Sequence, residues 1–417
     1  MRFGPIVLRP LGALVVGLML VASVGPVAAQ NQSRIIKVLA MGKASSTPTL
    51  TAWLTAEPST DPTVIATRAF GEVTGAVIMR YMRIYFPRTY DQLLTYEFIF
   101  LAQVDMSFIS AGQARWIYDA LKDYPKAAMN DRSIMSGVSA YYEMWRNSIL
   151  PEAFPNDVDA VIADDHNFQG HLGPLIVKDD PSLPNIMKPY KAMIEPVYPL
   201  YGGLNAVPKP GSVILSYTKN SVGVGSPLPG QIAHVFYWKW NRSITFTFRD
   251  MVTDSFWSSP AGNPYALDII ANMIWWSTGR DLPDDPLMVH DYRRLVFNYA
   301  IQKSLLTSLL DFAEIFGADS SKIYAASEAT EEYRTRAARD YLDKDFVAAH
   351  DAMKMAMAEL EKLEDDAMRL KDKAMFWVYL VQWLATTGVF LVAAVVLWSL
   401  MVRRRLYREV SSTRLSA

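Results

Sequence analysis

The sequence contains no cysteine among its 417 residues and only five histidines. The absence of cysteine excludes disulfides, cysteine-ligated zinc, iron–sulfur clusters and any thiol nucleophile. Charged residues are also scarce, since they make up 20% of the chain. The 41 basic residues nearly balance the 42 acidic ones. The net charge of −1 excludes a globally basic surface for nucleic acid, so we expect no nucleic-acid partner.

The first apolar run lies at the N-terminus. Arg2 and Arg9 precede an uncharged apolar segment at residues 11–24, and small residues end at Ala29. This order is typical of a secretory signal peptide covering residues 1–29. An uncleaved membrane anchor is the alternative, and both interpretations predict export.

The second apolar run extends from Phe376 to Val402 without a charge. About 20 apolar residues cross a bilayer core, so we expect a transmembrane helix at 374–405 that has the lipid bilayer as its partner. Arginines 403, 404, 405 and 408 follow at once. By the positive-inside rule, residues 406–417 form a cytoplasmic tail and the rest of this single-pass cell-membrane protein lies outside.

The near-neutral charge is a sum of unlike parts. Arg2 and Arg9 give the leader +2, and five arginines with Glu409 give the residues after Val402 a charge of +4. The segment between the leader and the transmembrane helix therefore carries −7. An acidic ectodomain on a basic tail is the result.

Residues 30–282 predict a three-layer α/β domain, called the head below. Short β-rich runs alternate with helical patterns, which favours a largely parallel sheet. Strands are expected at 34–41, 63–70, 97–102, 133–139, 158–163, 212–217 and 243–248, and helices at 110–121 and 265–276. The aromatic run 236–240 is interpreted as an alternating strand with one face in the core, rather than as a platform for sugar or peptide.

Several segments in the same order resemble class I glutamine amidotransferase-like domains. They are the run from Tyr90 to Asp105, the turn from Ser136 to Ser139, the strand from Pro208 to Leu215, and residues 244–250 followed by 263–266. The resemblance covers residues 34–280 and implies a flavodoxin-like fold. The arginine-rich run at 400–408 after a helical stalk also resembles a group of uncharacterised membrane-anchored archaeal proteins built on that domain.

The chemistry that this resemblance implies is missing. The family uses a cysteine nucleophile on a strand-to-helix elbow and a histidine followed by glutamate two residues on. This chain has no cysteine, and none of its histidines has an acid two residues later. We therefore expect a non-catalytic domain. Ser136 and Ser139, at the elbow region, are the weak candidates for a nucleophile.

The densest group of metal-ligand residue types comprises Asp164, Asp165, His166 and His171. Carboxylates with imidazoles suit zinc or another divalent ion. The two histidines are five residues apart in a glycine-containing segment, not four apart on a helix, so a polar surface loop is favoured.

No metal or cofactor is predicted. The glycine-rich residues 223–230 are not followed by the helix that a phosphate-binding loop requires. Asn31 and Asn241 begin N-glycosylation sequons.

Residues 283–373 predict a helical stalk. Helices are expected at 295–316, ending at Gly317, at 327–342 with Ser327 as N-cap, and from Phe346 onward, with a hinge at 343–345. A heptad-like seam follows the last helix, at Met353, Met357, Leu360, Leu363, Ala367, Leu370 and Ala374. It predicts a helical hairpin with residues 333–342; a coiled coil with another chain is the alternative. The last helix has no proline or glycine before Gly388, so we expect it to continue into the membrane.

These features together predict a membrane-anchored, extracytoplasmic binding, sensing or complex-assembly protein with a protein partner in the membrane or envelope. One alternative is an exported hydrolase that uses Ser139 or the Asp/His group. Another is a structural subunit of the cell envelope.

Overall fold

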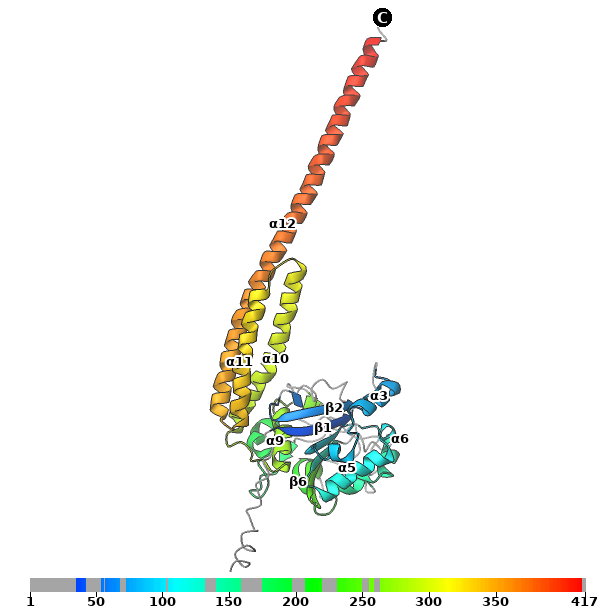
Figure 1. The fold of residues 1–417 in the computed structure, drawn as a ribbon, viewed down its shortest axis with the longest axis vertical. Helices are drawn as coiled ribbons and strands as arrows, with labels where there is room; N and C mark the ends of the chain where they lie inside the picture. Colours follow the sequence, from blue (N-terminus) through cyan, green and yellow to red (C-terminus); the bar gives the residue numbers. More distant parts are fainter. Residues whose placement is uncertain are drawn as a thin grey trace, which may run out of the picture.

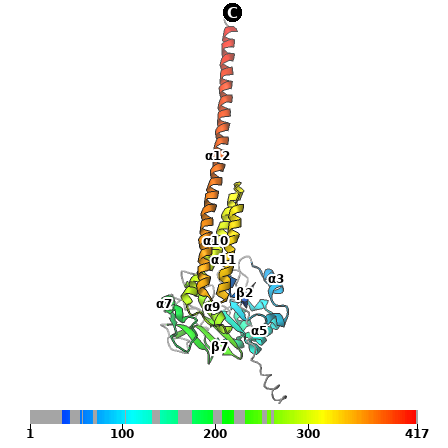
Figure 2. The same ribbon diagram turned by 60° about the vertical axis from the view of Figure 1, so that its left-hand side comes forward.

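The computed structural model describes residues 35–42, 54–55, 57–67, 73–102, 104–131, 140–158, 175–196, 207–219, 231–249, 255–258 and 263–414. Figures 1 and 2 show a rounded α/β head from which three long helices rise, the last of them far beyond the other two. The expected signal peptide at residues 1–29 lies outside the described residues.

One eight-stranded mixed sheet, in the order β2-β1-β3-β4-β8-β7-β6-β5, forms the centre of the head. Strands β2, β1, β3, β4 and β8 pair in parallel, whereas β7, β6 and β5 continue the sheet in antiparallel pairs. The strands are β1 (Ile36–Gly42), β2 (Thr60–Ala66), β3 (Phe98–Ala102), β4 (Ala127–Asp131), β5 (Leu175–Val177), β6 (Val213–Lys219), β7 (Gln231–Trp240) and β8 (Ser243–Phe248).

The expectation of a largely parallel sheet is therefore only partly correct. Strands β7 and β8 are joined by the two residues Asn241 and Arg242, and so short a link connects antiparallel strands only. Asn241 has the positive φ of 51° that tight hairpin turns favour. The expected strand at 236–240 is confirmed as part of β7, but its burial does not alternate, because Phe236 and Tyr237 lie on opposite faces of the strand and both are buried.

Both faces of the sheet are covered by apolar side chains. In β1, Ile36, Val38 and Ala40 belong to one buried cluster, while Leu39 and Met41 belong to the other. The first cluster contains α9 and the stalk helices, and the second contains α3 and α5. This alternation confirms the layered α/β prediction, since successive side chains of a strand point to opposite faces.

The helices of the head are α3 (Gly75–Tyr85), α4 (Tyr90–Leu93), α5 (Ala111–Asp123), α6 (Ala140–Arg146), α7 (Lys191–Ile194), α8 (Ser255–Ser258) and α9 (Ala266–Ser277), with short 3₁₀ turns at Met106–Phe108, Leu150–Ala153 and Lys188–Tyr190. Helix α5 begins where the sequence predicts it. The Ser110 and Gln113 side chains cap each other's backbone amides, which satisfies N–H groups that a helix start leaves unpaired.

Strands β1 and β3 approach each other closely at their ends. Gly42 has φ of +143°, and a Cβ built on it would lie 1.4 Å from the Ala102 carbonyl oxygen. Only glycine fits this position, because any larger residue would meet backbone.

The stalk is a three-helix bundle of α10 (Pro286–Ile315), α11 (Ser321–Leu342) and the first part of α12 (Phe346–Arg414). Two expected starts are corrected. Helix α10 begins nine residues earlier than predicted, because Asp285 accepts hydrogen bonds from the Leu287 and Met288 amides and Pro286 suits the first turn. Helix α11 begins at Ser321, so Ser327 is a buried residue within it and not its N-cap.

The predicted seam of α12 faces α10 and α11. Met353 and Leu360 are fully buried, and Ala374 is the last buried residue of α12 up to Arg405, where the description of its side chains ends. The three helices pack their seam side chains into the first apolar cluster of the head. The predicted hairpin of α11 and α12 is therefore confirmed, with α10 as a third member.

Helix α12 continues without interruption from Phe346 to Arg414. Among the described residues, α12 is the one helix that is long and apolar enough to cross a membrane, and its most apolar stretch is not buried inside the molecule.

The break between α11 and α12 falls at Lys344, whose φ of 65° agrees with the predicted hinge at 343–345.

Candidate functional site

The site residues predicted from sequence lie outside the described residues. Ser136 and Ser139 follow the end of β4 in the chain by five and eight residues, and Asp164, Asp165, His166 and His171 precede β5. Within the described part of the chain, no group of three or more His, Asp or Glu side chains could hold a metal ion.

The carboxyl ends of the parallel strands, where open α/β sheets usually bind ligands, carry buried polar residues. Asn130 at the end of β4 accepts a 2.5 Å hydrogen bond from the Thr247 hydroxyl of β8 and donates one of 3.3 Å to Asn156. Asp131, the last residue of β4, and Arg249, the residue directly after β8, are fully buried as well. We call Asn130, Asp131, Asn156, Thr247 and Arg249 the edge cluster.

A serine–histidine pair that the sequence did not reveal lies on the neighbouring antiparallel strands. The Ser216 hydroxyl of β6 is 3.1 Å from Nδ1 of His234 in β7, and the His234 ring stacks on Trp257 at an interplanar angle of 2°. Both members of the pair are fully buried, so a substrate has no direct access to the hydroxyl. The two residues are 18 positions apart on consecutive strands, and the contact depends on the register of β6 against β7, so the one signal in the sequence was the polar His234 within an apolar run.

A second buried polar group joins the head to the stalk. Arg293 of α10 donates from Nε to Glu57, just before β2, over 2.6 Å, and from Nη1 to Asp268 of α9 over 2.9 Å. The Tyr341 hydroxyl of α11 donates to the same Glu57 carboxylate over 3.1 Å, and His290 Nδ1 lies 2.7 Å from Asp268. We call Glu57, Asp268, His290, Arg293 and Tyr341 the junction network.

The junction network is almost completely removed from water. The side chains of Arg293, Glu57 and Asp268 are each 1% exposed, and that of His290 is 14% exposed. The other oxygen of Glu57 accepts from the Ser59 amide and hydroxyl, and Ser59 accepts from the Trp275 indole. Because charges buried in this way must be paired to be tolerated, each element is held in register by the others.

Burial and charge act on the same groups in opposite directions. Desolvation raises the pKa of Tyr341 well above its usual value, so the phenol stays protonated and can donate to Glu57. Desolvation alone would lower the pKa of Arg293, but Glu57, Tyr341 and Asp268 raise it well above its usual value. Two carboxylates face one guanidinium, and His290 supplies a second positive charge only when it is protonated.

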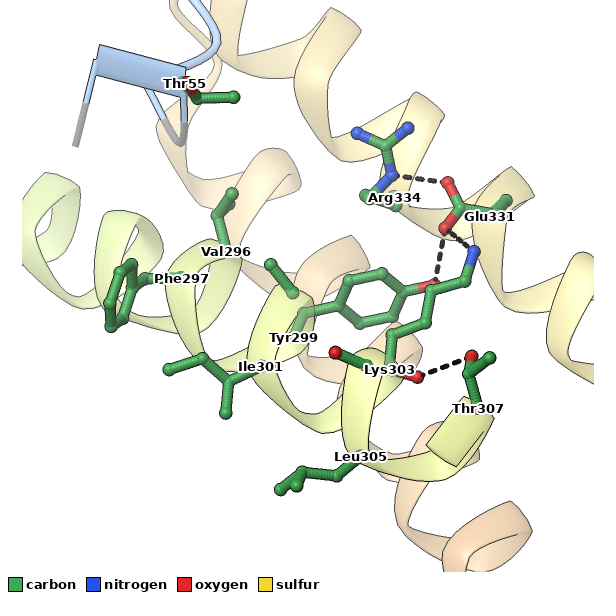
Figure 3. Close-up of a pocket in the computed structure, with 12 residues that line it drawn as sticks. Thr55, Val296, Phe297, Tyr299, Ile301, Lys303, Leu305, Thr307, Glu331 and Arg334 are labelled. Atoms are coloured by element: carbon green, nitrogen blue, oxygen red, sulfur yellow. Dashed lines mark hydrogen bonds and ion pairs between the residues drawn. The ribbon is translucent and has the colours of Figure 1, made fainter. Parts of the chain in front are cut away.

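A pocket of about 790 Å³ opens on the stalk between α10, α11 and Thr55. Its apolar wall comes from α10 and includes Val296, Phe297, Ile301 and Leu305. Figure 3 shows these side chains on one side and a charged group on the other. We call this cavity the stalk pocket.

The charged side of the stalk pocket is centred on Glu331 of α11. Its carboxylate accepts from Lys303, Arg334 and the Tyr299 hydroxyl (Figure 3). Burial alone would raise the pKa of Glu331, but the hydrogen bonds from Lys303 and Arg334 hold it below its usual value of 4.5. An apolar wall beside a charged rim that carries one excess positive charge suits an elongated amphipathic ligand or a partner helix.

The fold thus defines an α/β protein with an eight-stranded mixed sheet and a long C-terminal helix. No protein-family model matches the chain. No curated protein matches it.

Two solved structures from Salmonella typhimurium are similar to part of the chain. The cytoplasmic protein STM1381 of strain LT2 shares 14% sequence identity at a TM-score of 0.42, over 57% of this chain and 98% of that one. The cytoplasmic protein STM3548 shares 15% identity at a TM-score of 0.39, over 58% of this chain and 98% of that one.

Proposed function

We propose that the protein is a single-pass membrane protein whose non-catalytic head serves binding, sensing or complex assembly. The observation that carries this proposal is the junction network together with the unbroken α12. The network ties the sheet, α9, α10 and α11 together through buried charges, and α12 packs against the same bundle before it becomes apolar. These contacts pack the head against the bundle that includes the first part of α12, which supports a role in which the head is held close to the membrane anchor.

The head is proposed to be flavodoxin-like and related to the amidotransferase-like domains. Its five parallel strands in the order β2-β1-β3-β4-β8 support this, since the flavodoxin-like order runs 2-1-3-4-5. The missing cysteine supports the absence of amidotransferase chemistry. The carboxyl edge with its buried polar side chains and the stalk pocket are the two places proposed to contact a ligand or a protein partner.

The head is proposed to lie outside the cell and the tail in the cytoplasm. The support is Arg403, Arg404 and Arg405, which follow the apolar part of α12 directly. Because the chain lacks cysteine, single cysteines report topology without background. We expect Lys122→Cys, exposed on α5, to react with an impermeant maleimide in intact cells, and Ser412→Cys to react only after permeabilisation.

The opposite labelling pattern would show that the head lies in the cytoplasm. Recovery of the chain in the soluble fraction would contradict the proposal that α12 anchors it in a membrane.

The binding role is tested by purifying the full chain in mild detergent. We expect a stoichiometric partner protein to co-purify, and a homogeneous monomer without a partner would contradict complex assembly. Labelling by a serine-directed probe that Ser139→Ala abolishes, or a stoichiometric bound metal, would replace the proposal by the exported hydrolase.

A further inference from the structure

The tip of the α10–α11 hairpin, residues 311–320, presents apolar side chains to its surroundings. Ile315 is 78% exposed, more than any other large apolar side chain of the described residues, including those of the apolar part of α12. Phe312 is 40% exposed, and its ring packs against that of Phe316 with centroids 4.8 Å apart. Three apolar side chains gathered at one end of a helix mark a contact surface.

The tip lies beside the point where α12 leaves the bundle. Helices α10 and α12 both rise from the head, and α11 returns between their ends (Figures 1 and 2). At 1.5 Å per residue, α10 rises about 44 Å from Pro286 to Ile315, and α12 rises about 42 Å from Phe346 to Ala374. Ala374 is the last buried residue of α12, and Phe376, 61% exposed, begins its uncharged run. The tip and the start of that run are therefore level.

We propose that the hairpin tip is a second membrane contact, in which Ile315, Phe312 and Phe316 rest in the interfacial layer of the bilayer. The inference rests on the proposed membrane anchoring of α12. The occupant follows from continuity, because a bilayer that covers Phe376 and Trp377 also reaches the side chains at the same height. Aromatic and aliphatic side chains favour this layer.

The charges of the tip indicate which lipid surface it suits. Asp311, Glu314 and Asp319 outnumber Lys322 between residues 311 and 322. Asp311 accepts from the Tyr324 hydroxyl over 2.6 Å, Glu314 accepts from Ser320, and Asp319 accepts from the Ser321 amide over 3.1 Å. Apolar burial and not attraction to anionic headgroups drives the contact, so a zwitterionic phosphatidylcholine bilayer is sufficient.

A second copy of the chain could also cover this face of α10, so the experiment must distinguish a bilayer from a second copy. Ile301, Leu305, Ser308, Phe312 and Ile315 follow one another at intervals of four, three, four and three residues, as in a coiled-coil seam. A second copy of the chain would cover the whole stripe, whereas a bilayer reaches only its tip. Ile301 lies about 21 Å below Ile315 along the helix axis.

The experiment uses spin labels on three single-cysteine variants, Ile315→Cys, Ile301→Cys and Val392→Cys, of the full chain in phosphatidylcholine nanodiscs. Collisions with oxygen, which partitions into lipid, are compared with collisions with a water-soluble nickel chelate. We expect oxygen to dominate at 315 and 392, and nickel to dominate at 301. Sulfonated maleimide reactivity of the same variants before labelling gives an independent measure of exposure to water.

Each other result overturns the inference in a distinguishable way. If collisions with nickel dominate at 315 and collisions with oxygen dominate at 392, the tip does not contact the bilayer but α12 still crosses it. If collisions with nickel dominate at both positions, neither the membrane anchor nor the tip contact exists. Dipolar broadening at both 301 and 315, lost on dilution with unlabelled chain, assigns the stripe to a second copy of the protein.

Discussion

Arg293 and Glu57 are 236 residues apart in the chain, yet Nε of the first and Oε2 of the second lie 2.6 Å apart with both side chains 1% exposed. One is near the start of the head and the other is on the first stalk helix. This pair, shared with Asp268, couples the sheet to the bundle. A buried pair is not by itself a source of stability, but the loss of one partner is costly.

Arg293→Met tests that coupling. The substitution leaves Glu57 and Asp268 as buried carboxylates without their guanidinium, so we expect a loss of about 3–5 kcal/mol in the free energy of unfolding. Denaturant unfolding of the full chain in detergent measures it. Arg294→Met is the matched control, because the adjacent Arg294 is 63% exposed and, within the described residues, forms its ion pair with Asp291 on its own helix. Equal losses for the two variants would contradict the role of the junction network.

Gly42→Ala tests the close approach of β1 and β3. The new Cβ would meet the Ala102 carbonyl oxygen, and the backbone conformation is unfavourable for alanine. We expect a loss of at least about 1–3 kcal/mol. Gly112→Ala in α5 is the control, since nothing lies within 4 Å of its added Cβ, and a gain of about 0.4–1 kcal/mol is expected there. A neutral Gly42→Ala would show that the two strands separate easily.

Met353→Ala and Met355→Ala test the seam of α12 with one residue type on opposite faces. Met353 is fully buried and Met355 is 42% exposed. Truncation at Met353 removes core contacts and leaves a cavity, so it should cost about 2–5 kcal/mol. Truncation at Met355 should change stability by less than about 0.5 kcal/mol. Thermal unfolding followed by circular dichroism separates the two cases, and a larger loss at Met355 would mean that the bundle packs in another register.

Glu331 makes the stability of the stalk depend on pH. Its folded-state pKa lies below the usual 4.5, so the folded chain binds fewer protons than the unfolded chain as the pH falls past that value. The stabilisation by Lys303 and Arg334 is present above pH 4.5 and is lost as the pH falls through the folded pKa. We expect the difference in melting temperature between the wild type and Glu331→Gln to shrink on acidification.

The control for that experiment is Glu328→Gln, which removes one negative charge from an exposed position of the same helix. Its melting temperature should stay close to that of the wild type at neutral pH. A Glu331→Gln difference that does not change between pH 7 and pH 3 would contradict the ion-pair explanation.

The elements that local physics determines were predictable from the sequence. Ser110 and Gln113 form a capping box in the first turn of α5, Gly317 follows the end of α10 with φ of +81°, and the seam of α12 repeats every three or four residues. Strand β4 was missed, because Ala127–Asp131 contains no β-branched or aromatic residue and becomes a strand through pairing with β3 and β8.

The contacts that define the candidate sites were not predictable in the same way. Glu57 reads as one acid in a loop, and Asp268, His290 and Arg293 read as ordinary polar residues on helices. Their meeting depends on how α10 docks against α9 and β2, which no local pattern specifies. The local signal was Asp268, the one charged residue of the mostly apolar α9. The predicted fold class and the candidate membrane helix depended on periodicity and length, which the sequence carries directly.

The uninterrupted course of α12 has a consequence for angular register. A helix turns by about 100° per residue, so the direction in which the head faces, relative to the C-terminal end of α12, is set by the number of residues between the bundle and that end. One residue added after Ala374 would turn the head by about 100° relative to the tail, and four added residues would leave it about 40° from its original direction. The length of this helix therefore sets the rotational orientation of the head about the helix axis relative to the C-terminal end of α12.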